Sequence, residues 1–142
     1  MTRDRLIFEA TPALLAPRIR AALAATPPPG GLDPTVGTII PTGRDTGAKT
    51  PLVVITQDGP GSIRTRIHHA APIRVLAWAP TEDATDDLIQ HVHALTTALH
   101  DDSIAAVTPL TAPWVDTDPD SGRPMGAFTV TVHQIANTLT RH

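Results

Sequence analysis

The chain has 142 residues, which suits one domain spanning 1–142, and its formal net charge is −3 with the seven histidines counted as neutral. This mild acidity disfavours free-standing nucleic-acid binding, and the lack of cysteine excludes disulfides, thiolate metal sites and cysteine nucleophiles. The start lacks the apolar stretch of a secretory signal and no run approaches the ~18 apolar residues of a membrane span, so we expect a soluble cytoplasmic protein.

The first predicted element is a helix over residues 11–25. Thr11 is a candidate N-cap, and Pro12 suits the first helical position, where its missing N–H costs nothing. Pro17 should kink this helix or delay its start. An apolar stripe at helical spacing predicts the buried face, and the run TPPPGG predicts the end. The stripe consists of Leu15, Ile19 and Leu23.

Three strands should follow the first helix. Short strands are expected at 35–40 and 52–56, separated by a loop over 41–51 whose glycines and prolines predict mobility. Apolar and polar residues then alternate over 63–78, which predicts one long strand with its odd positions facing the core. Pro72 cannot donate a ladder hydrogen bond, so we expect an edge, bulge or bend there.

A second helix and two strands complete the predicted fold. Thr81 is a candidate N-cap, the acidic residues after it suit a helix N-terminus, and Leu88, Val92, Leu95 and Leu99 form one apolar stripe. A strand over 103–115 is interrupted by Pro109 and Pro113, and a cleanly alternating strand covers 126–136. The order α-β-β-β-α-β-β predicts an α+β fold, with an antiparallel sheet of four to five strands and both helices on one face.

The acidic stretch VDTDPDSGRP admits two interpretations. Its carboxylates, Asp116, Asp118 and Asp120, have the alternate spacing of a calcium loop, but counting from Asp116 places Ser121 and Ala127 where an EF-hand needs glycine and glutamate. A type I turn explains the stretch better, with Asp118 at position i, proline at i+1 and Gly122 free to take a positive φ. We therefore predict a hairpin tip whose other carboxylates could meet a basic partner.

No catalytic, cofactor or metal site is predicted. The histidines lack metal-ligand spacing, although a site assembled across the fold stays open. No serine lies in a nucleophile elbow, and the loop TGRDTGAK lacks the spacing of a phosphate-binding loop.

Basic and aromatic residues instead suggest a protein interface. Arginine and tryptophan are enriched at interfaces, and the even positions of the long predicted strand carry Arg64, Arg66, Arg74 and Trp78. The alternative is an outer face that the chain's own helices partly cover. Arg44 and Lys49 of the 41–51 loop complete the candidate interface set, together with the three aspartates above.

Two stretches carry a resemblance to a known family. IRVLAWAPTEDATDDLIQHVHALTTALHD and DPDSGRPMGAFTVTVHQIA resemble the central strand and helix and the closing hairpin of tail terminator (tail completion) proteins of long-tailed phages. The similarity is clearest from Ile63 to Ile135, and the helix at 11–25 and the strand near Thr35 also fit.

The resemblance implies a non-enzymatic virion protein. It would form a ring, commonly a hexamer, that caps the tail tube, ends tube polymerisation and offers a surface to the head–tail connector. Its partners would be other copies of itself, the tube protein and the connector, with DNA passing through the lumen without specific contact. It would be found in the host cytoplasm during assembly and then in the virion tail or neck. The alternatives are a neck adaptor and, in a different class, a small metal-dependent enzyme using scattered His and Asp.

Overall fold

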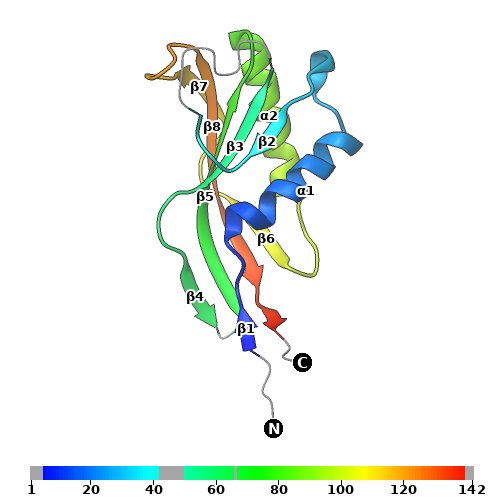
Figure 1. Cartoon of the computed structure of the whole chain (residues 1–142), viewed down its shortest axis with the longest axis vertical. Helices are drawn as coiled ribbons and strands as arrows, with labels where there is room; N and C mark the ends of the chain where they lie inside the picture. The colour runs from blue at the N-terminus through cyan, green and yellow to red at the C-terminus, as the bar shows by residue number, and fades with distance from the viewer. Residues whose placement is uncertain (1–4, 42–49, 66, 140–142) are drawn as a thin grey trace.

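A seven-stranded sheet forms the centre of the computed structural model, which describes residues 5–41, 50–65 and 67–139. Its strands follow the order β2-β3-β5-β8-β6, with β4 also paired to β5 and β7 also paired to β8 (Figure 1). The bounds are β2 Thr35–Gly37, β3 Leu52–Gln57, β4 Ser62–Thr65, β5 His68–Trp78, β6 Ile104–Pro109, β7 Trp114–Thr117 and β8 Pro124–Ile135.

The α+β class is confirmed, but the predicted number and direction of the strands are wrong. The sheet is mixed, because β2 runs parallel to β3 with Thr35 opposite Leu52, while the other described pairs are antiparallel. A parallel pair needs a connection that returns along the strand, unlike the short turn that can join an antiparallel pair. Residues 42–49, most of the loop predicted to be mobile, lie outside the described residues.

The predicted long strand over 63–78 is a hairpin. The chain reverses between β4 and β5, which pair antiparallel with Thr65 opposite His68. The backbone N–H of Ile67 donates to Thr65 Oγ1 at 3.4 Å, so a threonine side chain supports a reversal that usually uses glycine or asparagine. The predicted strand over 103–115 is likewise two strands, β6 and β7, separated at its prolines as expected.

The first helix, α1 (Thr11–Ala25), has the predicted extent but not the predicted cap. Ala10 occupies the N-cap position, and Thr11 is a buried first-turn residue whose hydroxyl donates to Gln134 Oε1 at 3.4 Å. Pro17 lies inside α1 without ending it. Pro17 and Ala13, whose carbonyl loses its helical donor there, are both exposed, so water can satisfy that carbonyl. A short 3-10 turn, η1 (Pro29–Gly31), then leads toward β2.

The second helix, α2 (Glu82–Thr97), confirms its predicted start and buried face. Thr81 is the N-cap, and its hydroxyl accepts a hydrogen bond from the backbone N–H of Ala84 at 3.1 Å. Leu88 and Val92 are fully buried, and the last two leucines of the stripe pack against the core while partly exposed.

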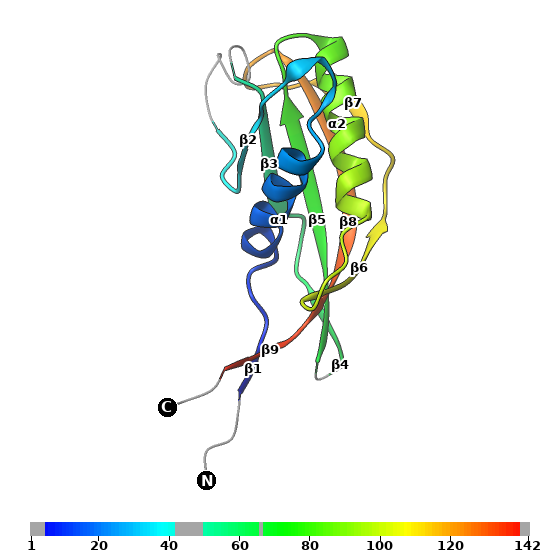
Figure 2. The same ribbon diagram turned by 90° about the vertical axis from the view of Figure 1, so that its right-hand side faces the viewer.

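Both helices cover one face of the sheet (Figure 2). Their apolar side chains pack against the odd-numbered residues of β5 and the even-numbered residues of β8, as the alternation predicted. Helix α2 lies directly on β8 at Gly126, where an added Cβ would stand 2.6 Å from Ile89 Cβ. The largest fully buried side chains of this core are Leu15, Ile19, Ile55, Ile73, Leu88, Ile89, Ile104 and Phe128.

The two ends of the described chain pair with each other. Strand β1 (Arg5–Ile7) and strand β9 (Asn137–Leu139) form a separate antiparallel two-stranded sheet. It extends beyond the end of the large sheet that also carries β4 (Figure 1).

Candidate functional site

The acidic stretch forms the tip of the β7–β8 hairpin, as predicted. The backbone N–H of Gly122 donates to the Asp118 carbonyl at 2.7 Å, and Gly122 has φ +70°, the left-handed conformation that glycine adopts without strain. The Asp118 carboxylate accepts from the backbone N–H of Asp120 at 3.0 Å and from the Ser121 hydroxyl at 2.8 Å. These bonds make Asp118 the organising residue of the turn.

Trp78, a candidate interface residue of the sequence analysis, is buried within the chain. Only 1% of Trp78 is exposed, and its indole Nε1 donates to Asp118 Oδ2 at 3.0 Å. The alternation identified the residues that share this face but not whether the face is covered. At this end of the sheet the face opposite the helices carries a second apolar cluster of Val54, Leu76, Trp78 and Ala127, with Leu52 and Met125 packed against it.

The three aspartates therefore have different environments. Asp118 is 8% exposed, whereas Asp116 and Asp120 are exposed. Burial alone raises the pKa of the Asp118 carboxyl, but hydrogen bonds from Ser121, Asp120 and Trp78 together hold that pKa below its usual range. Asp118 is consequently an ionised structural carboxylate, and only its two neighbours are positioned to meet a basic partner.

The predicted arginine stripe is divided between two strands. Arg64 is exposed on β4, and Arg74 on β5 forms an ion pair with Asp58, with 3.4 Å between Nη2 and Oδ1. Arg44, Lys49 and Arg66 lie outside the described residues. Of these five basic residues the structure thus describes Arg64 and Arg74, which lie on different strands and do not form one continuous face.

Two histidines that the sequence left apart meet on the sheet face opposite the helices. His68 Nε2 and His133 Nδ1 are 3.0 Å apart, and His133 Nε2 lies 3.3 Å from Thr108 Oγ1. Burial, followed by the nearby charges of His68 and Arg64, lowers the pKa of His133. No group of three or more His, Asp or Glu that could hold a metal ion occurs within the described residues.

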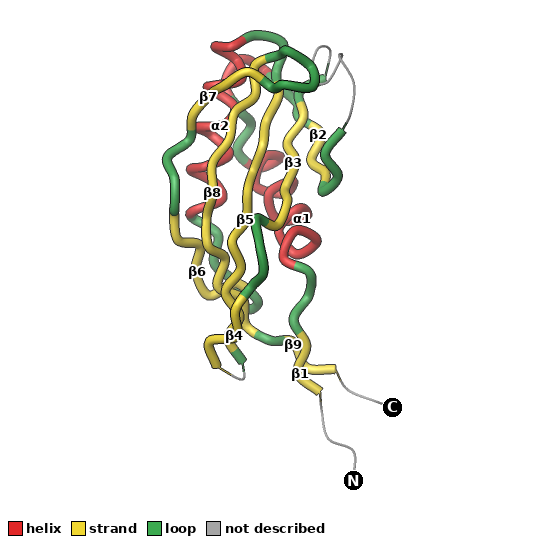
Figure 3. Tube along the Cα trace, turned by 90° about the vertical axis from the view of Figure 1, so that its left-hand side faces the viewer, coloured by secondary structure: helices red, strands yellow, loops and turns green. Residues whose placement is uncertain are grey.

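Large apolar side chains are exposed at both edges of the sheet. Ile39, which is 83% exposed, and Ile40 follow β2 at one edge. Leu110 and Trp114, which are 57% and 45% exposed, lie along β6 and β7 at the other edge (Figure 3). The sequence assigned Trp114 to a strand without marking it as a site, although an isolated tryptophan on a proline-bounded edge strand is a usable interface signal.

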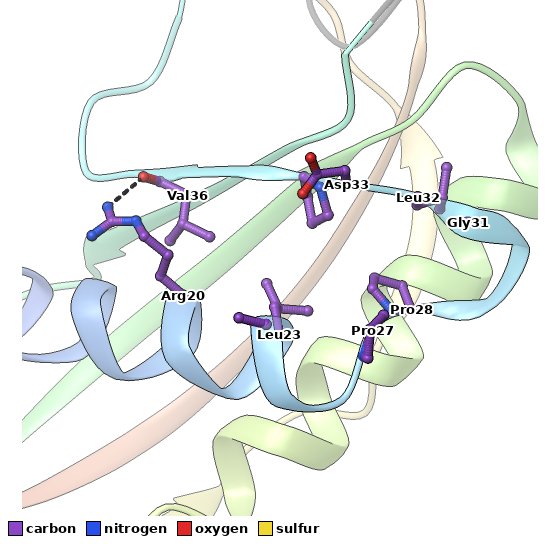
Figure 4. A pocket seen from close by; sticks show the side chains of 10 residues that line it. Arg20, Leu23, Pro27, Pro28, Gly31, Leu32, Asp33 and Val36 are labelled. Atoms are coloured by element: carbon purple, nitrogen blue, oxygen red, sulfur yellow. Dashed lines mark hydrogen bonds between the residues drawn. The ribbon is translucent and has the colours of Figure 1, made fainter.

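A pocket of about 400 Å³ lies between the C-terminal half of α1 and the segment that leads into β2 (Figure 4). Leu23, Pro27, Pro28 and Val36 contribute apolar walls, and Arg20 and Asp33 contribute the charges. Arg20 Nη2 donates to the Val36 carbonyl at 2.9 Å, which fixes the guanidinium beside β2. The lining contains no nucleophile and no acid–base pair, and its chemistry suits binding of an apolar group, with an anion at Arg20 or a cation at Asp33.

Comparisons with known proteins give no match for this chain, either among protein-family models or among curated proteins. None of the helices in the described residues is long and apolar enough to cross a membrane.

Proposed function

We propose that this chain is a structural subunit of a ring, of the tail-terminator type, that caps the tail tube of a long-tailed phage. In this role the ring stops polymerisation of the tube protein and offers its other side to the head–tail connector. DNA passes through its lumen without specific contact. The resemblance of two sequence stretches, clearest over residues 63–135, supports this assignment.

The observation that carries the proposal is the exposure of large apolar side chains at both edges of one sheet. A subunit that binds its neighbour head to tail needs two different surfaces, and repetition of such a contact closes into a ring when the rotation per subunit allows it. Ile39 and Ile40 supply apolar surface at the β2 edge, and Leu110 and Trp114 supply it at the β6–β7 edge. Tryptophan is enriched among the few residues that carry most of the binding energy of protein interfaces.

In the proposed role this chain carries no reaction centre. The pocket beside α1 offers binding groups and no reactive ones, and the paired His68 and His133 are held by each other and by Thr108. An assembly role depends on binding surfaces, and the exposed apolar side chains at the two edges of the sheet supply them.

Tube polymerisation tests the proposal. Purified protein is added to polymerising tube protein, and electron microscopy measures tube length and the ends of the tubes. We expect rings at one end of each tube and no growth past them. Tubes of unchanged length with bare ends would contradict the proposal. Fractionation of lysates lacking capsids separates the related adaptor role, because a terminator travels with tails whereas an adaptor travels with heads.

A further inference from the structure

Strand β7 carries an apolar anchor and a carboxylate on the same side. Val115 packs against the main core, so its neighbours Trp114 and Asp116 point away from the helices. Both are exposed, and within the described residues the other edge of β7 pairs with no strand. Residues two apart on a strand are separated by about 7 Å, so this edge presents an indole and a negative charge at a fixed spacing.

The opposite edge carries the matching groups. The pocket beside β2 combines apolar walls with the guanidinium of Arg20, and Asp33 adds a negative charge farther along the same lining (Figure 4). One N–H of that guanidinium is used by the Val36 carbonyl, and arginine has further donors for a carboxylate. Pockets of several hundred Å³ hold ligands larger than an indole ring, so the volume of about 400 Å³ is sufficient.

We propose that Trp114 of one copy of this chain inserts into the α1–β2 pocket of the next copy, where Asp116 pairs with Arg20. This inference rests on the proposed ring and identifies its subunit contact. The occupant is a second copy because one chain carries both complementary surfaces on opposite edges of its sheet (Figure 3). Neither surface complements itself, so the contact repeats head to tail.

Charge reversal tests the pairing. Mass photometry over a dilution series measures the affinity between copies, alone and on capped tubes, for Arg20→Asp, Asp116→Arg, the double variant and Trp114→Ala. Each single variant should weaken the contact at least tenfold, because central anchors and desolvated charge pairs dominate interfaces. The double variant should recover most of that loss. Asp102→Arg, an exposed charge reversal in the loop between α2 and β6, is the matched control and should assemble as the wild type does.

Crosslinking gives a readout of proximity that does not depend on affinity. The chain has no cysteine, so Arg20→Cys with Asp116→Cys introduces the reactive thiols. A short bis-maleimide should join this double variant into a ladder of covalent multimers, while either single variant yields at most dimers. Circular dichroism confirms that each variant is folded.

The outcomes separate the two proposals. If the wild type forms rings but charge reversal has no effect and no ladder appears, the contact is elsewhere and the ring stands. If the wild type forms no ring alone or at tube ends, the proposed function fails and the contact fails with it. Ring loss in the single variants, with recovery in the double variant, supports both.

Discussion

Removal of the Asp118 carboxylate should destabilise the protein by about 1.5–4 kcal/mol. The larger contribution comes from Trp78, which is 1% exposed and would keep a buried indole N–H without an acceptor. A buried donor without a hydrogen-bond acceptor costs roughly 1–3 kcal/mol of stability. The bonds from Ser121 and Asp120 add less, about 0.5–1 kcal/mol, because water can replace the carboxylate at the hairpin tip.

Urea unfolding followed by far-UV circular dichroism measures this difference for Asp118→Ala. Asp120→Ala, a change at an exposed position two residues along the same turn, is the control and should stay within about 0.5 kcal/mol of the wild type. A double-mutant cycle with Trp78→Phe isolates the indole contact. The loss of stability caused by Asp118→Ala should be smaller in the Trp78→Phe background, because phenylalanine has no N–H that needs an acceptor. If Asp118→Ala unfolds at the same urea concentration as Asp120→Ala, the carboxylate does not secure Trp78 and the reasoning is refuted.

Two further predictions concern the core and the histidines. Gly126→Ala should destabilise the protein by about 1–3 kcal/mol, because the added Cβ would lie 2.6 Å from Ile89 Cβ. Gly37→Ala is the control, because no atom lies within 4 Å of a Cβ added there. Equal unfolding midpoints for the two variants would contradict the tight α2–β8 contact. The pKa of His133 is lowered, and burial also lowers the pKa of His93. Below a pH of about 6.5 the folded state therefore binds fewer protons than the unfolded state, so the free energy of unfolding should fall as the pH drops through that value. His133→Asn should reduce this fall between pH 7.5 and 5.5, and a pH dependence identical to that of the wild type would show that His133 titrates normally.

Local periodicity accounts for most of the fold that could be predicted from the sequence. Helix α2 and strand β8 have a strong apolar pattern and clear boundary residues, so their faces and ends follow from the chain alone. The β4–β5 reversal was missed because the alternation continues through a turn that contains no glycine, proline or asparagine. The direction of β2 was missed because strand direction is decided by the path of a connection and not by local residues.

The candidate site was less predictable for a related reason. A period of two shows which side chains share a face of a strand, but burial depends on what lies over that face. Trp78 and Trp114 illustrate the difference, since one is enclosed beside the hairpin tip and the other is exposed on an edge strand. The role of Asp118 became visible only when the turn and the indole were placed together. The pocket beside α1 is likewise assembled from a helix, a proline-rich turn and a strand that no short motif links.

The pairing of β1 with β9 brings two distant parts of the chain to within one strand spacing, with Arg5 opposite Leu139. A short peptide linker between these strands would close the backbone into a circle without disturbing the large sheet, and new ends could then be opened at an exposed turn elsewhere. The same geometry makes the β1–β9 end of the molecule a convenient place for a fluorescent or affinity label. A label attached beside either strand would project from one corner of the subunit, away from the α1–β2 pocket (Figure 1).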